Sequence, residues 1–124
     1  MVETDKKWIA FVINQILINA VKYSKAVEKK DKSMVFKIME EESKVIVSIK
    51  DNGIGIPKED LGRVFNAFFT GKNGRKTSES TGMGMYLSKR ICDKLSHGLF
   101  VRSKQGDGTE FSIVFYRGKN IFKL

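Results

Sequence analysis

The 124 residues, 41% of them hydrophobic, suffice for one domain with a buried core, which we expect to span residues 1–124. A formal net charge of +9 favours anionic partners such as nucleotide phosphates, an acidic protein face or an anionic membrane, while the chain carries no signature of a nucleic-acid-binding module. The single cysteine excludes an internal disulfide, and no apolar run reaches the roughly 18 residues of a membrane span.

The first predicted element is a helix from Lys6 to Tyr23 or beyond, capped by Thr4 or Asp5. Apolar side chains cover nearly its whole circumference, so we expect it to be largely buried. It begins close to Met1, which fits a domain excised from a longer parent.

Alternating apolar residues then predict four strands in two hairpins, 34–39 with 44–50 and 99–103 with 110–116. A short helix over 58–65 and a long one over 82–95 lie between the hairpins, separated by a polar segment, 70–80, that we expect to be a mobile loop. This order of elements predicts an α+β fold, a two-layer sandwich with a helical layer over a mixed β-sheet.

The most informative segment runs from Asp51 to Pro57, directly after the apolar strand. Gly53 and Gly55 allow a flat ligand to lie against bare backbone. A carboxylate beside that surface accepts a hydrogen bond from an exocyclic amino group, which adenine has and guanine lacks at the equivalent place. Taken alone, such a run is more often a turn.

The first helix carries a polar face made of Gln15, Asn19, Lys22 and Tyr23. Polar groups on an otherwise apolar helix need a reason, because each costs about 1–3 kcal/mol when buried without a partner. An amide oxygen ligates Mg²⁺, a lysine neutralises phosphate and an aromatic ring packs on adenine. The alternative is that Asn19 caps a buried backbone group and Lys22 extends its amine to solvent.

Two further glycine-containing segments can be interpreted either as parts of a ligand-binding site or as structural turns. Residues 81–85, Thr-Gly-Met-Gly-Met, open the second long helix and place backbone N–H groups where phosphates bind. The alternative is a packing turn. Residues 106–111, Gly-Asp-Gly-Thr-Glu-Phe, contain a glycine pair that a plain hairpin also uses.

In this order the segments resemble the catalytic ATP-binding domain of sensor histidine kinases, within the superfamily of gyrase, Hsp90, histidine kinase and MutL ATPases. Five boxes of that family match, over nearly the whole chain: the N box at 15–24, the G1 box at 51–57, the F box at 65–68, the G2 box at 81–85 and the last glycine box at 106–111. The surroundings of Trp8, Gln15 and residues 81–86 further resemble the intramembrane-sensing kinases of Gram-positive bacteria that respond to bacitracin-type antimicrobial peptides. The resemblance implies a Bergerat-type ATP-binding fold.

The resemblance also implies ATP and Mg²⁺ as cofactors and gives residues their roles. Asp51 would accept from the adenine amino group in a pocket shaped by Gly53 and Gly55. Asn19 would coordinate Mg²⁺, Lys22 would contact phosphate and Tyr23 would lie near the base or sugar. Further ATP contacts are implied for residues of the boxes and of an ATP lid over 68–80: Ile56, Phe68, Lys72, Arg75, Lys76, Thr81, Gly82, Met83, Gly84, Met85 and Thr109.

Gln15 stands where the family usually has Asn, and Ser80 stands where the G2 box often begins with Gly. The extra methylene of Gln15 disfavours a direct metal contact and leaves a water-mediated one open. ATP-hydrolysing members and anti-sigma serine kinases carry Glu there as general base, and glutamine takes up no proton. Because neutral imidazole already offers a lone pair, Gln15, Asn19 and Lys22 together favour phosphoryl transfer to histidine.

The only histidine, His97, lacks the acidic neighbour and helical setting of a phospho-acceptor, so we expect it at a surface turn, and we expect Cys92 to be buried. The acceptor histidine would therefore lie on a separate dimerisation domain, which would pass the phosphoryl group to an aspartate of a response regulator receiver domain. The isolated domain would be monomeric and cytoplasmic, and its parent a homodimer in the bacterial membrane. Two alternatives are a non-catalytic nucleotide-binding module and an anti-sigma-type serine kinase.

Overall fold

The computed structural model describes residues 5–25, 32–67 and 83–117. Its helices are α1 (Lys6–Lys25), α2 (Lys58–Leu61) and α4 (Gly84–Lys94), and its strands are β1 (Met34–Glu40), β2 (Lys44–Asp51), β3 (Gly98–Lys104) and β4 (Gly108–Tyr116). Each lies where the apolar periodicity predicts it, and α2 is shorter than expected because it ends at Gly62.

The strands form one sheet in the order β1-β2-β4-β3. Every neighbouring pair among the described strands is antiparallel, where we expected a mixed sheet. The two strands of each hairpin pair antiparallel because a short turn reverses the chain between them. Strands β2 and β3, which are joined through the helices, run in the same direction but are separated by β4. The two-layer α+β class itself is confirmed.

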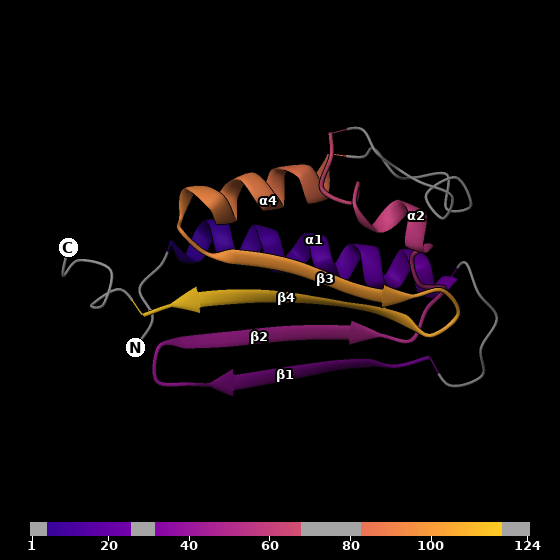
Figure 1. Cartoon of the computed structure of the whole chain (residues 1–124), viewed down its shortest axis with the longest axis horizontal. Helices are drawn as coiled ribbons and strands as arrows, with labels where there is room; N and C mark the ends of the chain where they lie inside the picture. Colours follow the sequence, from indigo (N-terminus) through magenta and orange to yellow (C-terminus); the bar gives the residue numbers. More distant parts are fainter. Residues whose placement is uncertain (1–4, 26–31, 68–82, 118–124) are drawn as a thin grey trace.

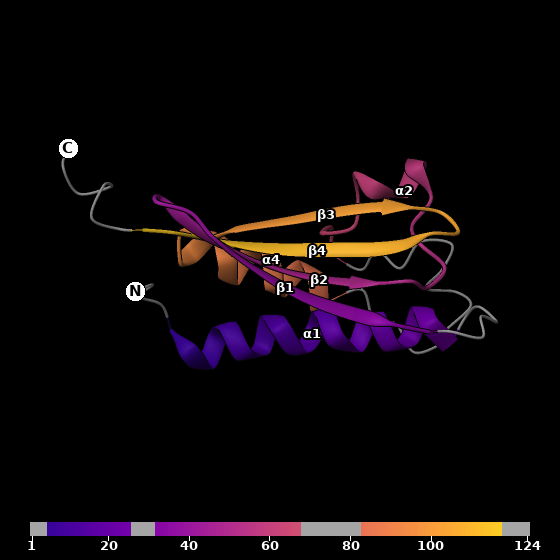
Figure 2. The ribbon, with the colours of Figure 1, turned by 90° about the horizontal axis from the view of Figure 1, so that it is seen from below.

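The core lies between the sheet and helices α1 and α4, which cover one of its faces (Figures 1 and 2). Inward-facing positions of β2 and β4 supply Ile49 and Ile113, which pack against Val12 of α1 and Cys92 of α4 in one hydrophobic cluster. Burial raises the pKa of the Cys92 thiol to about 11, and its expected place in the interior is confirmed.

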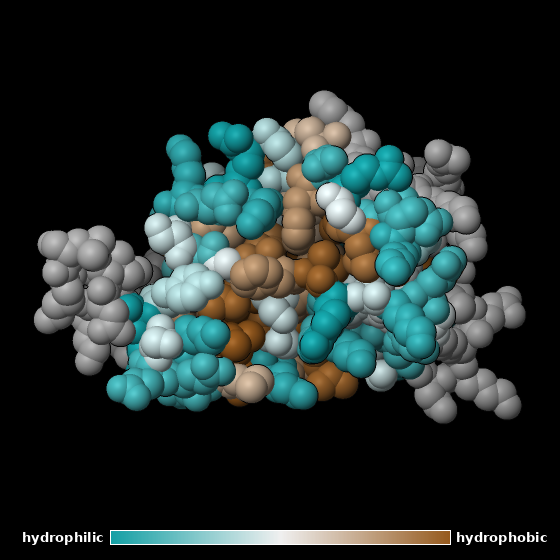
Figure 3. Space-filling view, viewed as in Figure 1, coloured by the Kyte–Doolittle hydropathy of each residue, from teal (hydrophilic) through white to brown (hydrophobic). Residues whose placement is uncertain are grey.

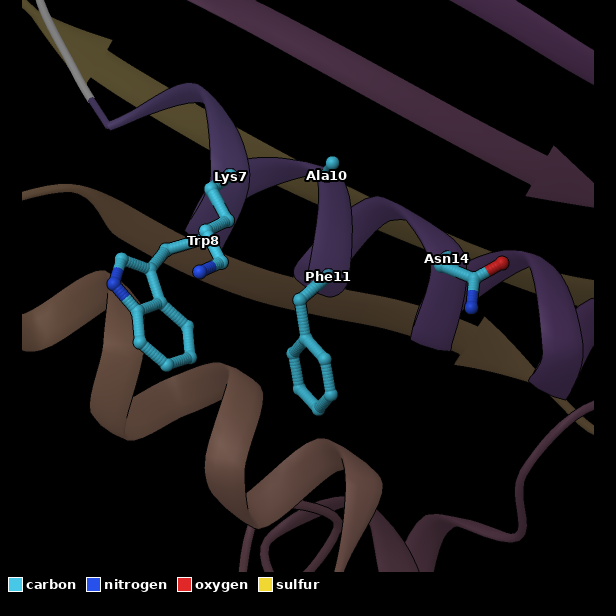
Figure 4. A pocket seen from close by; sticks show the side chains of 5 residues that line it. All are labelled: Lys7, Trp8, Ala10, Phe11 and Asn14. Atoms are coloured by element: carbon cyan, nitrogen blue, oxygen red, sulfur yellow. The ribbon is translucent and has the colours of Figure 1, made fainter.

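Helix α1 is less buried than its apolar circumference predicts. Val12 is 0% exposed, whereas Trp8 and Val21 are 48% and 47% exposed. The sheet and α4 cover only part of the circumference of the helix. Figure 4 shows Trp8 and Phe11 directed toward α4, and with Lys7, Ala10 and Asn14 they line a shallow hollow. The expectation that this helix is largely buried was therefore wrong.

The opposite face of the sheet also exposes apolar side chains. Met39, Phe100 and Tyr116 are all exposed on outward-facing positions of the strands. Figure 3 shows apolar residues along the middle of the molecule, bordered by hydrophilic ones. Within the described residues, no helix has the length and apolarity needed to cross a bilayer.

His97 corrects another expectation, because it is buried rather than at the surface, with 7% exposure. Ser96 adopts a left-handed φ of 61°, and the His97 N–H donates to the Cys92 carbonyl at 2.8 Å. This turn directs the imidazole inward, edge-on against Phe115 with 4.7 Å between ring centroids. Burial lowers the pKa of His97, which favours the neutral ring.

Candidate functional site

Asp51 ends β2 and is buried, with 4% of the residue exposed. Its Oδ1 accepts a hydrogen bond from the Gly53 N–H at 2.8 Å, as an aspartate at a turn commonly does. Gly53 is itself buried. The carboxylate is thus held in a defined direction at the start of the glycine-containing loop.

The loop after Asp51 packs against the β3–β4 turn. The Gly106 N–H donates to the Ile54 carbonyl at 2.8 Å. Gly55 has a φ of +78°, and a Cβ at this position would overlap the backbone carbonyl of Lys104. Glycine is therefore required at residue 55 both by its backbone conformation and by the close approach of the β3–β4 turn.

Ser103 of β3 links the loop to β4. Its Oγ accepts from the Ile56 N–H at 2.8 Å, donates to the Gly108 carbonyl at 2.6 Å and lies 2.9 Å from Thr109 Oγ1. Sequence reasoning did not single out Ser103. The available signal was a hydroxyl two residues after Val101, on the same inward face of the strand as Leu99 and Val101.

Thr109, 1% exposed, lies directly opposite Asp51 in the register of β2 and β4. Side chains of directly opposed residues stand on the same face of a sheet, with Cβ atoms about 4.5–5.5 Å apart. A buried carboxylate and a buried hydroxyl therefore lie side by side, next to the loop that carries Gly53, Gly55 and Ile56.

The polar face of α1 is described for Gln15, Asn19 and Lys22, all half-buried. A Cβ on Gly84 would overlap Gln15 Oε1 and lie 3.1 Å from its Cδ, so the Gln15 amide sits directly on the first residue of α4. Helix α4 starts from Met83 without a side-chain cap and has no acidic residue in its first turn. Met85 packs its side chain into the core.

Several parts of the candidate site gather at one end of the molecule. The carboxyl end of α1, the end of β2, the β3–β4 turn and α2 lie there together in both views (Figures 1 and 2). The side chain of Tyr23 lies outside the described residues, as do all the lid and G2 residues predicted between 68 and 82: Phe68, Lys72, Arg75, Lys76, Thr81 and Gly82.

The described groups differ in chemistry between the two parts of the site. The buried carboxylate of Asp51 and the buried hydroxyl of Thr109 suit a ring that presents an amino group. The side-chain amides of Gln15 and Asn19 on α1, and the N-terminus of α4, suit anionic groups. Among the described residues no cluster of three or more His, Cys, Asp or Glu is placed to hold a metal ion.

Comparison with known proteins gives three kinds of match. The model of the family described as histidine kinase-, DNA gyrase B-, and HSP90-like ATPase matches residues 4–119. The sensor histidine kinase YxdK of Bacillus subtilis is 42% identical over 112 residues, 90% of this chain and 34% of YxdK. The sensor protein kinase GraS of Staphylococcus aureus is 39% identical over 92% of the chain and 32% of its own length. The chain thus spans about a third of these curated relatives.

Solved structures agree in fold. The mycobacterial sensor histidine kinase MprB superposes with a TM-score of 0.75 at 23% identity, covering 93% of this chain and 74% of that one. The catalytic domain of the histidine kinase ThkA gives a TM-score of 0.74 at 23% identity, covering 93% and 71%. The sandwich described above is therefore the fold of histidine kinase catalytic domains.

Proposed function

The chain belongs to the family of histidine kinase-, DNA gyrase B- and HSP90-like ATPases, and from this premise we propose that it is the ATP-binding catalytic domain of a two-component sensor histidine kinase. The observation that carries the proposal is the buried carboxylate of Asp51 beside the glycine-containing loop. The relatives that are sensor kinases, YxdK and GraS among them, support the assignment of the parent protein.

At the base end, Asp51 accepts a hydrogen bond from the adenine amino group, and the ring lies against the backbone of Gly53 and Gly55. The turn that packs on Gly55 keeps this surface rigid before the ligand arrives. A rigid pocket reduces the entropy that binding would otherwise cost.

At the phosphate end, Asn19 offers an amide oxygen and Lys22 a positive charge. The donor set fits Mg²⁺, which typically takes few protein ligands and several phosphate oxygens. When bound, Mg²⁺ neutralises charge on the phosphates. The amides that open α4 hold the phosphate chain, and the lid residues Lys72, Arg75 and Lys76 are proposed to meet the γ-phosphate.

The reaction is transfer of the γ-phosphoryl group to a histidine on the dimerisation domain. The imidazole nitrogen forms a bond to the γ-phosphorus while the bond from that phosphorus to the β,γ-bridging oxygen breaks, and ADP leaves. Gln15 takes no proton in this step; it lies on Gly84 and holds the start of α4 against α1. Positioning and charge neutralisation then supply most of the rate enhancement.

In this proposal the parent is a membrane-bound homodimer of the intramembrane-sensing class, and the phosphoryl group passes on to the receiver domain of a response regulator. His97 is not the acceptor, since its ring is buried against Phe115.

Label transfer from γ-labelled ATP tests the reaction. The chain is incubated with the histidine-bearing dimerisation domain of a close relative such as YxdK, with and without that domain's histidine replaced by glutamine. Acid-labile label on the histidine-containing domain alone is the expected result. Acid-stable label would indicate a serine kinase, and ATP binding without any transfer would favour a non-catalytic nucleotide-binding module.

A further inference from the structure

The hydrogen bonds of Ser103 determine which way the hydroxyl of Thr109 points. A serine hydroxyl has one proton to donate and two lone pairs to accept with. The Gly108 carbonyl only accepts, and at 2.6 Å from Ser103 Oγ it takes that proton. The Ile56 N–H occupies one acceptor position of the same oxygen.

The contact between Ser103 Oγ and Thr109 Oγ1, at 2.9 Å, then has only one possible direction. Ser103 has no second proton, so Thr109 must donate its own. The Thr109 oxygen is left with lone pairs only for whatever lies beside it. Its neighbour across the strands is Asp51, a carboxylate, which also only accepts.

We propose that Ser103 is a specificity-determining residue. By fixing the Thr109 proton, it makes the Thr109 hydroxyl and the Asp51 carboxylate accept hydrogen bonds from the base and never donate them. An amino group at position 6 of a purine has two N–H donors and suits two neighbouring acceptors, directly or through one bridging water. A carbonyl at that position meets lone pairs only. The inference rests on the proposed binding of ATP and extends it to a residue outside every sequence motif.

This role differs from that of a merely structural serine. Loss of the Ser103 hydroxyl loosens the loop at Ile56, and this weakens the binding of all nucleotides to a similar degree. Loss of the acceptor for Thr109, by contrast, frees a proton that can turn toward a 6-carbonyl. Discrimination against a missing or misplaced hydrogen-bonding group is a property of sites whose polar groups are fixed in direction.

The test compares the Kd values of ATP and inosine triphosphate, which differ at position 6 and in the N1–H that accompanies the carbonyl. In Ser103→Ala the Kd of inosine triphosphate divided by the Kd of ATP should fall about five- to tenfold, on the order of one neutral hydrogen bond. Ser103→Thr, which keeps a hydroxyl, should retain the wild-type ratio. Ser112→Ala removes a paired serine hydroxyl on the outer face of the sheet and serves as the matched control.

A second variant keeps the test decisive should Ser103→Ala fold poorly. Thr109→Val removes an acceptor, so it should weaken the binding of ATP several-fold and leave the affinity for inosine triphosphate unchanged or higher. An unchanged Kd ratio in Ser103→Ala, or a loss of inosine triphosphate binding in Thr109→Val as large as that of ATP, would overturn the inference. A wild-type chain that binds neither nucleotide would instead refute the proposed function.

Discussion

Gly55 gives the sharpest test of how the candidate base pocket is built. Substitution by alanine places a Cβ in the left-handed region, at φ +78°, and against the Lys104 carbonyl and the Cα of Gln105, the latter 2.9 Å away. The conformation costs about 1–2 kcal/mol and the overlap with backbone about 1–3 kcal/mol. The reduced entropy of the unfolded chain returns about 0.4–1 kcal/mol. We expect a net loss of roughly 2–4 kcal/mol.

Two other glycines allow the cost of the backbone conformation to be measured apart from the cost of the overlap. Gly106→Ala meets the positive φ, +93°, but its Cβ has nothing within 4 Å, so we expect a loss of about 1 kcal/mol. Gly62 has an ordinary φ of −71° and also nothing within 4 Å of a Cβ, so Gly62→Ala should stabilise slightly. Urea unfolding followed by circular dichroism measures all three. Equal losses for Gly55→Ala and Gly106→Ala would refute the close packing of the loop on the β3–β4 turn.

Three further predictions concern the metal and two buried titratable groups. Asn19→Ala should abolish the tightening of ATP binding by Mg²⁺, measured by calorimetry; tightening that persists several-fold would exclude Asn19 as the ligand. The pKa of Cys92 rises from an unfolded value of 9.0 to about 11, so the unfolded state loses its proton first and stability should fall between pH 9 and 11. Cys92→Ala should lack that fall in a urea series across this range. The pKa of His97 is lowered by burial, so the unfolded state binds a proton first and stability should decline as pH falls through 6.5; His97→Phe, tested by thermal melts, should decline less.

Most of the secondary structure follows from local patterns. The apolar alternation of 44–50 and 110–116 identifies β2 and β4 because their inward side chains must be buried. The order of the strands was not accessible in this way. The insertion of β4 between β2 and β3 depends on pairings between distant segments, which no local pattern encodes.

The candidate site shows the same division. Asp51 and its glycines stand out because a short run of sequence carries them. Ser103 does not, because its role depends on the register that brings Thr109 opposite it and on the loop that delivers the Ile56 N–H. His97 was misplaced because the backbone conformation at Ser96, rather than the polarity of the turn, decides where the ring points.

The proposed function depends most on Asp51 as the anchor of a nucleotide pocket. Calorimetric titration of the chain with ATP, with and without Mg²⁺, beside Asp51→Asn, tests it most directly. We expect ATP binding that tightens with Mg²⁺ and weakens about 10- to 100-fold in Asp51→Asn, which replaces a buried acceptor at a cost of about 1–3 kcal/mol. Near-wild-type affinity in Asp51→Asn, or no binding by the wild-type chain, would contradict it.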